Sequence, residues 1–245
     1  MPGQHLGRDE TVLRGAEIPH GAGNRTGDHK RHQAQRIRRI AERAEESRYP
    51  LTPQRIVHDV RRIMPEDGIV CLDNGMYKIW FARNYRTRVA NTLLLDNALA
   101  TMGAGLPSAI MAAMLYPARR VLAVCGDGGF MMNSQELETA VRVGVSLVVL
   151  VLQDNAYGMI RWKQVVDGFV DFGMSFGNPD FITYAMAYGI KGSRVESSDA
   201  LAPALEKAFA SGGLHLITVP VDYSENTRVL IDELCEYASG KGEQP

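Results

Sequence analysis

The stretch that decides the fold, Cys125–Gln164, reads CGDGGFMMNSQELETAVRVGVSLVVLVLQDNAYGMIRWKQ. Asp127 follows one apolar run and Asp154 follows a second one, with about one helix-length of chain between them. In that interval, Asn133 as N-cap with Glu136 three residues later predicts the start of a helix, and Gly144 predicts its end. Strand, helix and strand in this order predict one right-handed crossover unit of a parallel sheet.

The same alternation of strands and helices continues through residues 49–230. Thr52 and Pro53 carry the residue types of an N-cap and a first helical position, and they predict a helix that ends before Pro65. The predicted strands are apolar without strict alternation, which is typical of parallel sheets covered on both faces. We therefore expect a doubly wound, mostly parallel α/β sheet with helices on both faces. Further strands are predicted at 68–73, 91–96, 119–126 and 214–222, and further helices after Gly103, from Asn178 and from Ser198.

Composition limits the classes of partner. The chain has 45% hydrophobic and 22% charged residues and a formal net charge of −1, so neither nucleic acid nor a membrane surface is an expected partner. The longest apolar stretch, Val145–Leu152, is too short to cross a bilayer, and the N-terminus resembles no secretory signal. The three cysteines are far apart and fit neither a disulfide framework nor a zinc site. We expect a cytoplasmic protein.

The domain organisation follows from the change in texture near Tyr49. Residues 1–48 are predicted to be a polar extension, disordered over about 1–32 and helical over Gln33–Ser47. Residues 49–230 form the predicted domain, and residues 231–245 form a tail.

The two aspartates predict a metal site. Each follows the carboxyl end of a strand, and in open parallel sheets that edge is where ligands bind. Gly126, Gly128 and Gly129 allow a ligand to approach the backbone and offer unhindered N–H groups. Carboxylates beside such amides suit a magnesium ion that carries a diphosphate. Asp and Gly are also common in turns, but the second aspartate at this spacing favours the metal interpretation.

Two other phosphate-binding motifs are absent from the sequence. The glycine spacing of GDGGFMM is not that of G-x-G-x-x-G, which disfavours a nicotinamide dehydrogenase. No G-K-[ST] occurs, so the stretch is not a P-loop either.

Together, the motifs resemble the thiamine diphosphate-binding C-terminal domain of acetolactate synthase large subunits. The resemblance covers about residues 50–230. It implies the cofactors thiamine diphosphate and Mg²⁺, a 2-oxo acid substrate such as pyruvate, and a transferase of branched-chain amino acid biosynthesis. Beside GDGG and QD, it is carried by DNGMYKIW at 73–80, ALATMGAGLPSAI at 98–110, QELETA at 135–140 and PVDYSEN at 220–226.

The resemblance also implies roles for individual residues. Asp127, Asp154 and the carbonyl of Ala156 would bind the metal. The pair Gln153–Asp154 departs from the family's Asn-Asn, and Asn155 is a competing ligand if the register slips by one. The substrate side would be lined by Met159, Ile160 and Trp162, although simple packing is an equal alternative for Trp162. The cofactor contacts would come from Gly75, Met76, Tyr77, Ala100, Met102, Gly126, Gly128 and Gly129.

No catalytic residue is expected in this chain. In the family that the chain resembles, a glutamate from a separate pyrimidine-binding domain activates the cofactor, and residues 1–48 cannot form that domain. We therefore expect a chain that is inactive alone and works as a homo-oligomer or with a separate pyrimidine-domain subunit. Two candidate association surfaces are the helix after Gly103 and the aromatic segment Trp80–Tyr85. The alternative is a non-catalytic magnesium- and diphosphate-binding module, or a truncated remnant that assembles with a full-length relative.

Overall fold

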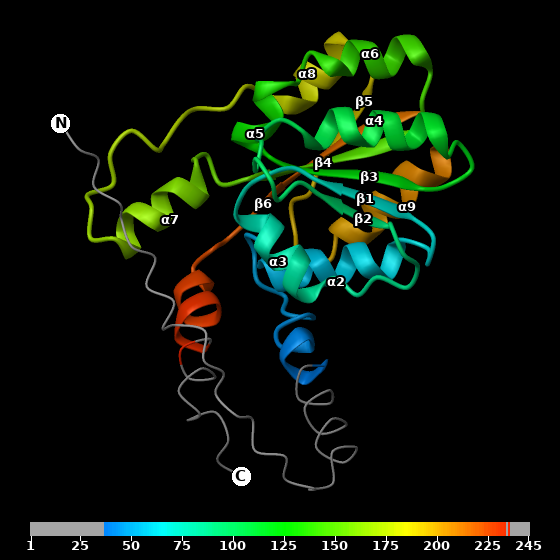
Figure 1. Ribbon diagram of the computed structural model, residues 1–245. Helices are drawn as coiled ribbons and strands as arrows, with labels where there is room; N and C mark the ends of the chain where they lie inside the picture. The colour runs from blue at the N-terminus through cyan, green and yellow to red at the C-terminus, as the bar shows by residue number, and fades with distance from the viewer. Residues whose placement is uncertain (1–36, 234, 236–245) are drawn as a thin grey trace, which may run out of the picture. The chain divides into compact units, whose positions relative to one another are not determined.

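A parallel β-sheet forms the core of the structure, a computed structural model in which residues 37–233 and 235 are described (Figure 1). Within these residues the sheet has six strands in the order β2-β1-β3-β4-β6-β5, and every neighbouring pair is parallel. The predicted doubly wound α/β fold is therefore confirmed. The strands are β1 (Ile69–Leu72), β2 (Leu93–Leu95), β3 (Val121–Gly126), β4 (Leu147–Gln153), β5 (Lys191–Arg194) and β6 (Leu214–Pro220).

Both faces of the sheet are covered by helices (Figure 1). Alternate residues of β4 belong to opposite cores: Leu150 packs on one face and Val149 on the other. This explains why the central strands are apolar at every position and not at every second one. One face carries α2 (Pro53–Ile63), α3 (Met76–Asn84) and α9 (Leu201–Ser211), and the other carries α4 (Gly105–Leu115), α6 (Glu136–Val143) and α8 (Phe181–Ala187).

Some helix ends follow the sequence signals and others do not. The Thr52 side chain accepts a hydrogen bond from the Arg55 amide at 3.4 Å, and Gly144 ends α6 with φ of 68°. The predicted cap of α6 by Asn133 is wrong, because Asn133 instead ends the short helix α5 (Asp127–Met132). Its side-chain amide donates to the Gly103 carbonyl at 2.8 Å, and this partner distant in sequence replaces the local cap.

Two further helix starts differ from the prediction. The N-cap of α8 is Asp180, whose carboxylate accepts from the Thr183 amide at 2.8 Å, and not Asn178. The N-cap of α9 is Ala200 and not Ser198. The chain therefore continues for two residues beyond each predicted start before it becomes helical.

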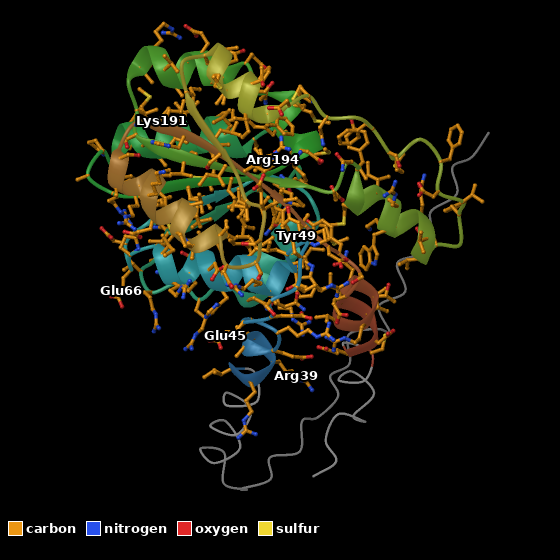
Figure 2. All side chains as sticks on the ribbon, turned by 180° about the vertical axis from the view of Figure 1, so that it is seen from behind. Arg39, Glu45, Tyr49, Glu66, Lys191 and Arg194 are labelled. Carbon is orange, nitrogen blue, oxygen red and sulfur yellow. The ribbon has the colours of Figure 1, made fainter. Side chains whose placement is uncertain are left out.

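Several elements were not predicted because they lack an apolar pattern. Strand β5 reads KGSR and, within the described residues, pairs only with β6, at the edge of the sheet; Lys191 and Arg194 are labelled in Figure 2. Helix α7 (Gly158–Val166) buries none of its residues. Helices α3 and α5 and a π-helical turn at Arg228–Asp232 were also missed.

Of the two candidate association surfaces, one is buried and the other is exposed. Trp80 and Phe81 are each 1% exposed and belong to the core, so the prediction of a surface at Trp80–Tyr85 is wrong. In contrast, Met111, Met114 and Leu115 of α4 are exposed.

Most predictions for the two chain ends concern residues that the structure does not describe. Residues 1–32, predicted to be disordered, and most of the tail at 231–245 lie outside the described residues. Of the helix predicted over Gln33–Ser47, the described part is helical at 37–41 and continues as a turn. None of the helices in the described ranges has the length and apolar character that a membrane span requires.

Parallel strands bring their carboxyl ends to one edge, and there the loops pack closely. A side-chain carbon at Gly129 would lie 2.4 Å from Oδ2 of Asp73, and one at Gly105 would lie 2.7 Å from Cβ of Asp73. Real Cβ atoms do not approach other atoms so closely. Glycine at these positions therefore permits the α4 and α5 helices to begin directly over the end of β1.

We expect Gly129→Ala to lower the free energy of unfolding by about 1–3 kcal/mol, because the added methyl must displace the buried Asp73 side chain. The matched control is Gly177→Ala, where an added carbon meets nothing within 4 Å and should be nearly neutral. Urea unfolding of both variants measures the difference. Equal stabilities would contradict the packing described here.

The thiols give a second test of the core. Burial raises the pKa of Cys71 to about 12 and the pKa of Cys125 well above its ordinary value, whereas Cys235 is exposed. At pH 8 we expect one fast-reacting thiol with Ellman's reagent in the native protein and three after denaturation. Since the native thiols keep protons that the unfolded chain releases, stability should fall as the pH rises from about 9 to 12. Fast labelling of a second thiol would contradict the buried placement.

Candidate functional site

A cleft opens at the carboxyl edge of the sheet, where the neighbouring strands β1, β3 and β4 end. The loops after these strands and the first turns of α3, α5 and α7 form its walls. The cleft is lined by Asn74, Gly75, Met76, Tyr77, Met102, Gly126, Asp127, Gly128, Gly129, Asp154, Ala156, Tyr157, Gly158, Met159, Ile160 and Tyr223.

Asp127 is held in place by hydrogen bonds from three parts of the chain. Its side chain is buried, and Oδ1 accepts the Gly128 amide at 2.8 Å. Oδ2 accepts the Asn155 amide at 2.8 Å and the side-chain amide of Asn178 at 2.7 Å. Because an ionised carboxylate only accepts hydrogen bonds, these N–H groups match its charged form.

Asp154 enters the same cleft from the end of β4. Burial raises the pKa of Asp154 to about 7, and the neighbouring charge of Asp127 contributes to the increase. Gly158 makes room for this side chain, because an added carbon there would lie 2.4 Å from Oδ2 of Asp154. The cleft thus brings together two carboxyl groups, and the charge of Asp127 disfavours the ionisation of Asp154.

Asn155, the competing ligand candidate, has a different position. Its backbone is left-handed, with φ of 54°, and the residue is exposed and absent from the cleft lining. Its side-chain oxygen accepts a hydrogen bond from Asn178 at 2.8 Å. Asp154 therefore faces the cleft, while the Asn155 side chain is engaged outside it.

Most of the other predicted site residues meet in this cleft, and two do not. Ala100 is exposed, with φ of 49°, on the loop that precedes Met102. Trp162 packs against the core on the side of α2 and α3, which matches its packing alternative. The predicted residues that line the cleft are Gly75, Met76, Tyr77, Met102, Gly126, Asp127, Gly128, Gly129, Asp154, Ala156, Met159 and Ile160.

The loop that carries Met102 is fixed from two sides. From the end of β1, Oδ1 of Asp73 accepts the Gly103 amide at 2.8 Å and the Asn74 side chain donates to the Thr101 carbonyl at 2.7 Å. From the end of α5, Asn133 donates to the Gly103 carbonyl. These bonds hold the backbone on both sides of Met102 and so place Met102 at the wall of the cleft.

Sequence reasoning missed five residues at the site: Asn74, Tyr157, Gly158 and Tyr223, which line the cleft, and Asn178, which contacts Asp127. Tyr223 lines the cleft from beyond β6, within the PVDYSEN motif that was noticed without a role for this residue. Asn178 was predicted as the start of a helix, but its hydrogen bonds to Asp127 and Asn155 place it beside the cleft. Its place before Pro179, which disfavours helix at the preceding residue, was the available signal.

Residues 73–219, more than half of the chain, match the family model "Thiamine pyrophosphate enzyme, C-terminal TPP binding domain". This range begins at the buried Asp73, directly after β1, and ends within β6, so it contains β3, β4 and every residue of the cleft lining except Tyr223.

Individual relatives agree with this match. The chain is 38% identical over 182 residues to the acetolactate synthase of Bacillus subtilis, and the aligned region covers 74% of this chain and 32% of the relative. It is 38% identical over 194 residues to the catabolic acetolactate synthase of Raoultella terrigena, covering 78% and 35%. The chain therefore spans about a third of the length of these curated relatives.

A solved structure is similar in fold. The thiamine diphosphate-dependent 4-hydroxybenzoylformate decarboxylase of Rhodococcus jostii RHA1 superposes with a TM-score of 0.66 at 24% identity, covering 71% of this chain and 33% of that one. The architecture, the extent of the family match and the relatives agree. The chain belongs to the thiamine pyrophosphate enzymes, and it contains their C-terminal domain, which binds thiamine pyrophosphate, in the form found in acetolactate synthases.

Proposed function

We propose that the cleft binds the diphosphate of thiamine diphosphate through Mg²⁺ and serves an acetolactate synthase-like enzyme that acts on 2-oxo acids such as pyruvate. The observation that supports this proposal is the convergence of Asp127 and Asp154 with Gly128 and Gly129 in one cleft. Carboxylates and backbone N–H groups are complementary to a divalent cation and to phosphate oxygens, respectively.

The residues present fit a magnesium ion. Asp127 and Asp154 supply carboxylate oxygens, and the carbonyl of Ala156, which also lines the cleft, is a third hard oxygen ligand. Two carboxylates and a diphosphate crowd negative charge into one place, and a divalent cation neutralises part of it. Asp154 is the second side-chain ligand in this proposal, and Asn155 is not a ligand.

The remaining walls orient the cofactor and exclude water. When bound, thiamine diphosphate supplies a nucleophilic carbon and an electron sink for the cleavage and formation of bonds next to a carbonyl. Met102 would pack against the cofactor rings, and the backbone carbonyl of Ala100, on the same loop outside the cleft lining, would accept a hydrogen bond from the amino group of the pyrimidine. Met159 and Ile160 form an apolar wall on the substrate side, which limits the access of water.

The group that activates the pyrimidine comes from elsewhere in this proposal. No glutamate lines the cleft in the described part of the chain. We therefore propose that a pyrimidine-binding domain, on a partner subunit or on another polypeptide, supplies the activating glutamate. The same observation also agrees with a second proposed function, that of a non-catalytic module that binds magnesium and diphosphate.

Calorimetry tests the metal assignment. We expect thiamine diphosphate to bind only with Mg²⁺, and Asp127→Ala or Asp154→Ala to weaken this binding about 100-fold or more, because each removes a metal ligand. Asn155→Ala is the matched control, since its side chain is engaged outside the cleft, and it should bind within a few-fold of the native chain. Loss of binding in Asn155→Ala with retention in Asp154→Ala would reverse the assignment.

Turnover measurements test the proposal that the activating glutamate comes from a separate pyrimidine-binding domain. We expect the 245-residue chain alone to consume no pyruvate in the presence of thiamine diphosphate and Mg²⁺, because no glutamate lines the cleft among the residues that the structure describes. Addition of a protein that carries the pyrimidine-binding domain should restore pyruvate consumption, measured as released CO₂. Activity of the chain alone would contradict the proposal. Cofactor binding without turnover, even with such partners, would favour the non-catalytic module.

A further inference from the structure

Asn178 connects the start of the α8 segment to Asp127 and Asn155 by hydrogen bonds, although it lies 51 positions from the first and 23 from the second. We propose that Asn178 is a positioning residue: it sets the orientation of the Asp127 carboxylate and holds the Asn155 side chain outside the cleft, so that Asp154 is left to face the metal. This inference rests on the function proposed above for the same cleft.

The three residues form a closed set of hydrogen bonds. The side-chain amide nitrogen of Asn178 donates to Oδ2 of Asp127 at 2.7 Å and to Oδ1 of Asn155 at 2.8 Å. The Asn155 backbone amide donates to the same Oδ2 at 2.8 Å. An amide NH₂ group has two N–H bonds, and here each has its own acceptor. Rotation of either acceptor side chain would break a bond to Asn178.

This arrangement distinguishes the two carboxylate oxygens of Asp127. Oδ2 receives two N–H donors, whereas the bond to Oδ1 comes from the adjacent Gly128 amide. A carboxylate oxygen accepts about two hydrogen bonds or metal bonds in its plane. Oδ2 is therefore saturated, and Oδ1 is the oxygen with acceptor capacity for a cation. Hydrogen bonds that orient a ligand in this way are general in metal sites.

Asn178 is itself held from both directions along the chain. On one side, the Phe176 amide donates to the Asn155 carbonyl at 3.1 Å and the Tyr157 amide donates to the Met174 carbonyl at 2.9 Å. On the other side, Pro179 restricts the backbone of Asn178 to extended conformations, and Asp180 caps α8. The side chain is therefore presented to Asp127 by a fixed backbone.

The two polar groups of the Asn178 side chain have opposite effects on stability. The side-chain oxygen of Asn178 is buried and finds no hydrogen-bond partner in the described part of the molecule. An unsatisfied buried oxygen is unfavourable, and an apolar side chain of the same size would avoid it. The asparagine is useful here for its two N–H bonds, and both point to residues of the proposed metal site.

The test compares Asn178→Leu, which keeps the size of the side chain and removes both donors, with Asp180→Ala. Asp180→Ala removes the α8 cap on the same segment and touches neither Asp127 nor Asn155. Mn²⁺ serves as the probe, and its dissociation constant in the presence of thiamine diphosphate is measured by electron paramagnetic resonance. We expect Asn178→Leu to weaken Mn²⁺ binding about 10–100-fold, and Asp180→Ala to lower the unfolding temperature with Mn²⁺ binding within about twofold of the native chain.

A second measurement needs no metal. In crystals of the metal-free Asn178→Leu variant, we expect the Asn155 side chain to leave its native position and the Asp127 carboxylate to rotate. Native positions for both side chains, or equal losses of Mn²⁺ binding in the two variants, would overturn the inference. Failure of the native chain to bind Mn²⁺ with the cofactor would instead contradict the proposed function, and the crystal comparison would still decide the role of Asn178.

Discussion

The carboxylate of Asp127 organises the cleft because it can only accept hydrogen bonds and is buried. Its N–H donors come from the first turn of α5, the residue after Asp154, and the segment before α8. Parts of the chain that are distant in sequence thus meet at one charged group. Without these donors, a buried ionised carboxyl would be strongly unfavourable, so the folding of the three loops and the charge of this side chain depend on one another.

The parallel sheet makes this meeting possible. Because all strands within the described residues run in the same direction, the loops after β1, β3 and β4 emerge at one edge, and Tyr223 reaches the same cleft from beyond β6. Ligand binding at this edge is general for open α/β sheets. The glycines over the end of β1 then allow the starts of α4 and α5 to lie close together at this edge.

The elements that could be predicted are those whose apolar residues reflect their burial in the core. The continuous apolar runs of β3 and β4 predicted a covered parallel sheet, and the spacing of Asp127 and Asp154 placed both side chains at one edge. The polar strand β5 and the unburied helix α7 lack such a pattern, and they were missed. The partners of Asn133 and Asn178 also escaped prediction, since local capping rules do not consider acceptors that folding brings near. The Trp80–Tyr85 segment failed for the related reason that apolar composition does not distinguish a core from an interface.

The contacts of Asp73 have a consequence for the way such a domain can diverge. Its side chain leaves space only for hydrogen at Gly105 and at Gly129, on two separate helices, while it also accepts the Gly103 amide. A bulkier residue at position 129 becomes tolerable once position 73 has become smaller, but a smaller residue at 73 no longer accepts the Gly103 amide. At Gly105 an added carbon would also lie 2.9 Å from the backbone nitrogen of Asp73 and 3.0 Å from Sγ of Cys125, so a smaller side chain at 73 makes no room there. Substitutions at positions 73 and 129 are therefore epistatic, and homologous sequences should exchange this acid and this glycine together or retain both, whereas glycine at 105 should be kept in either case.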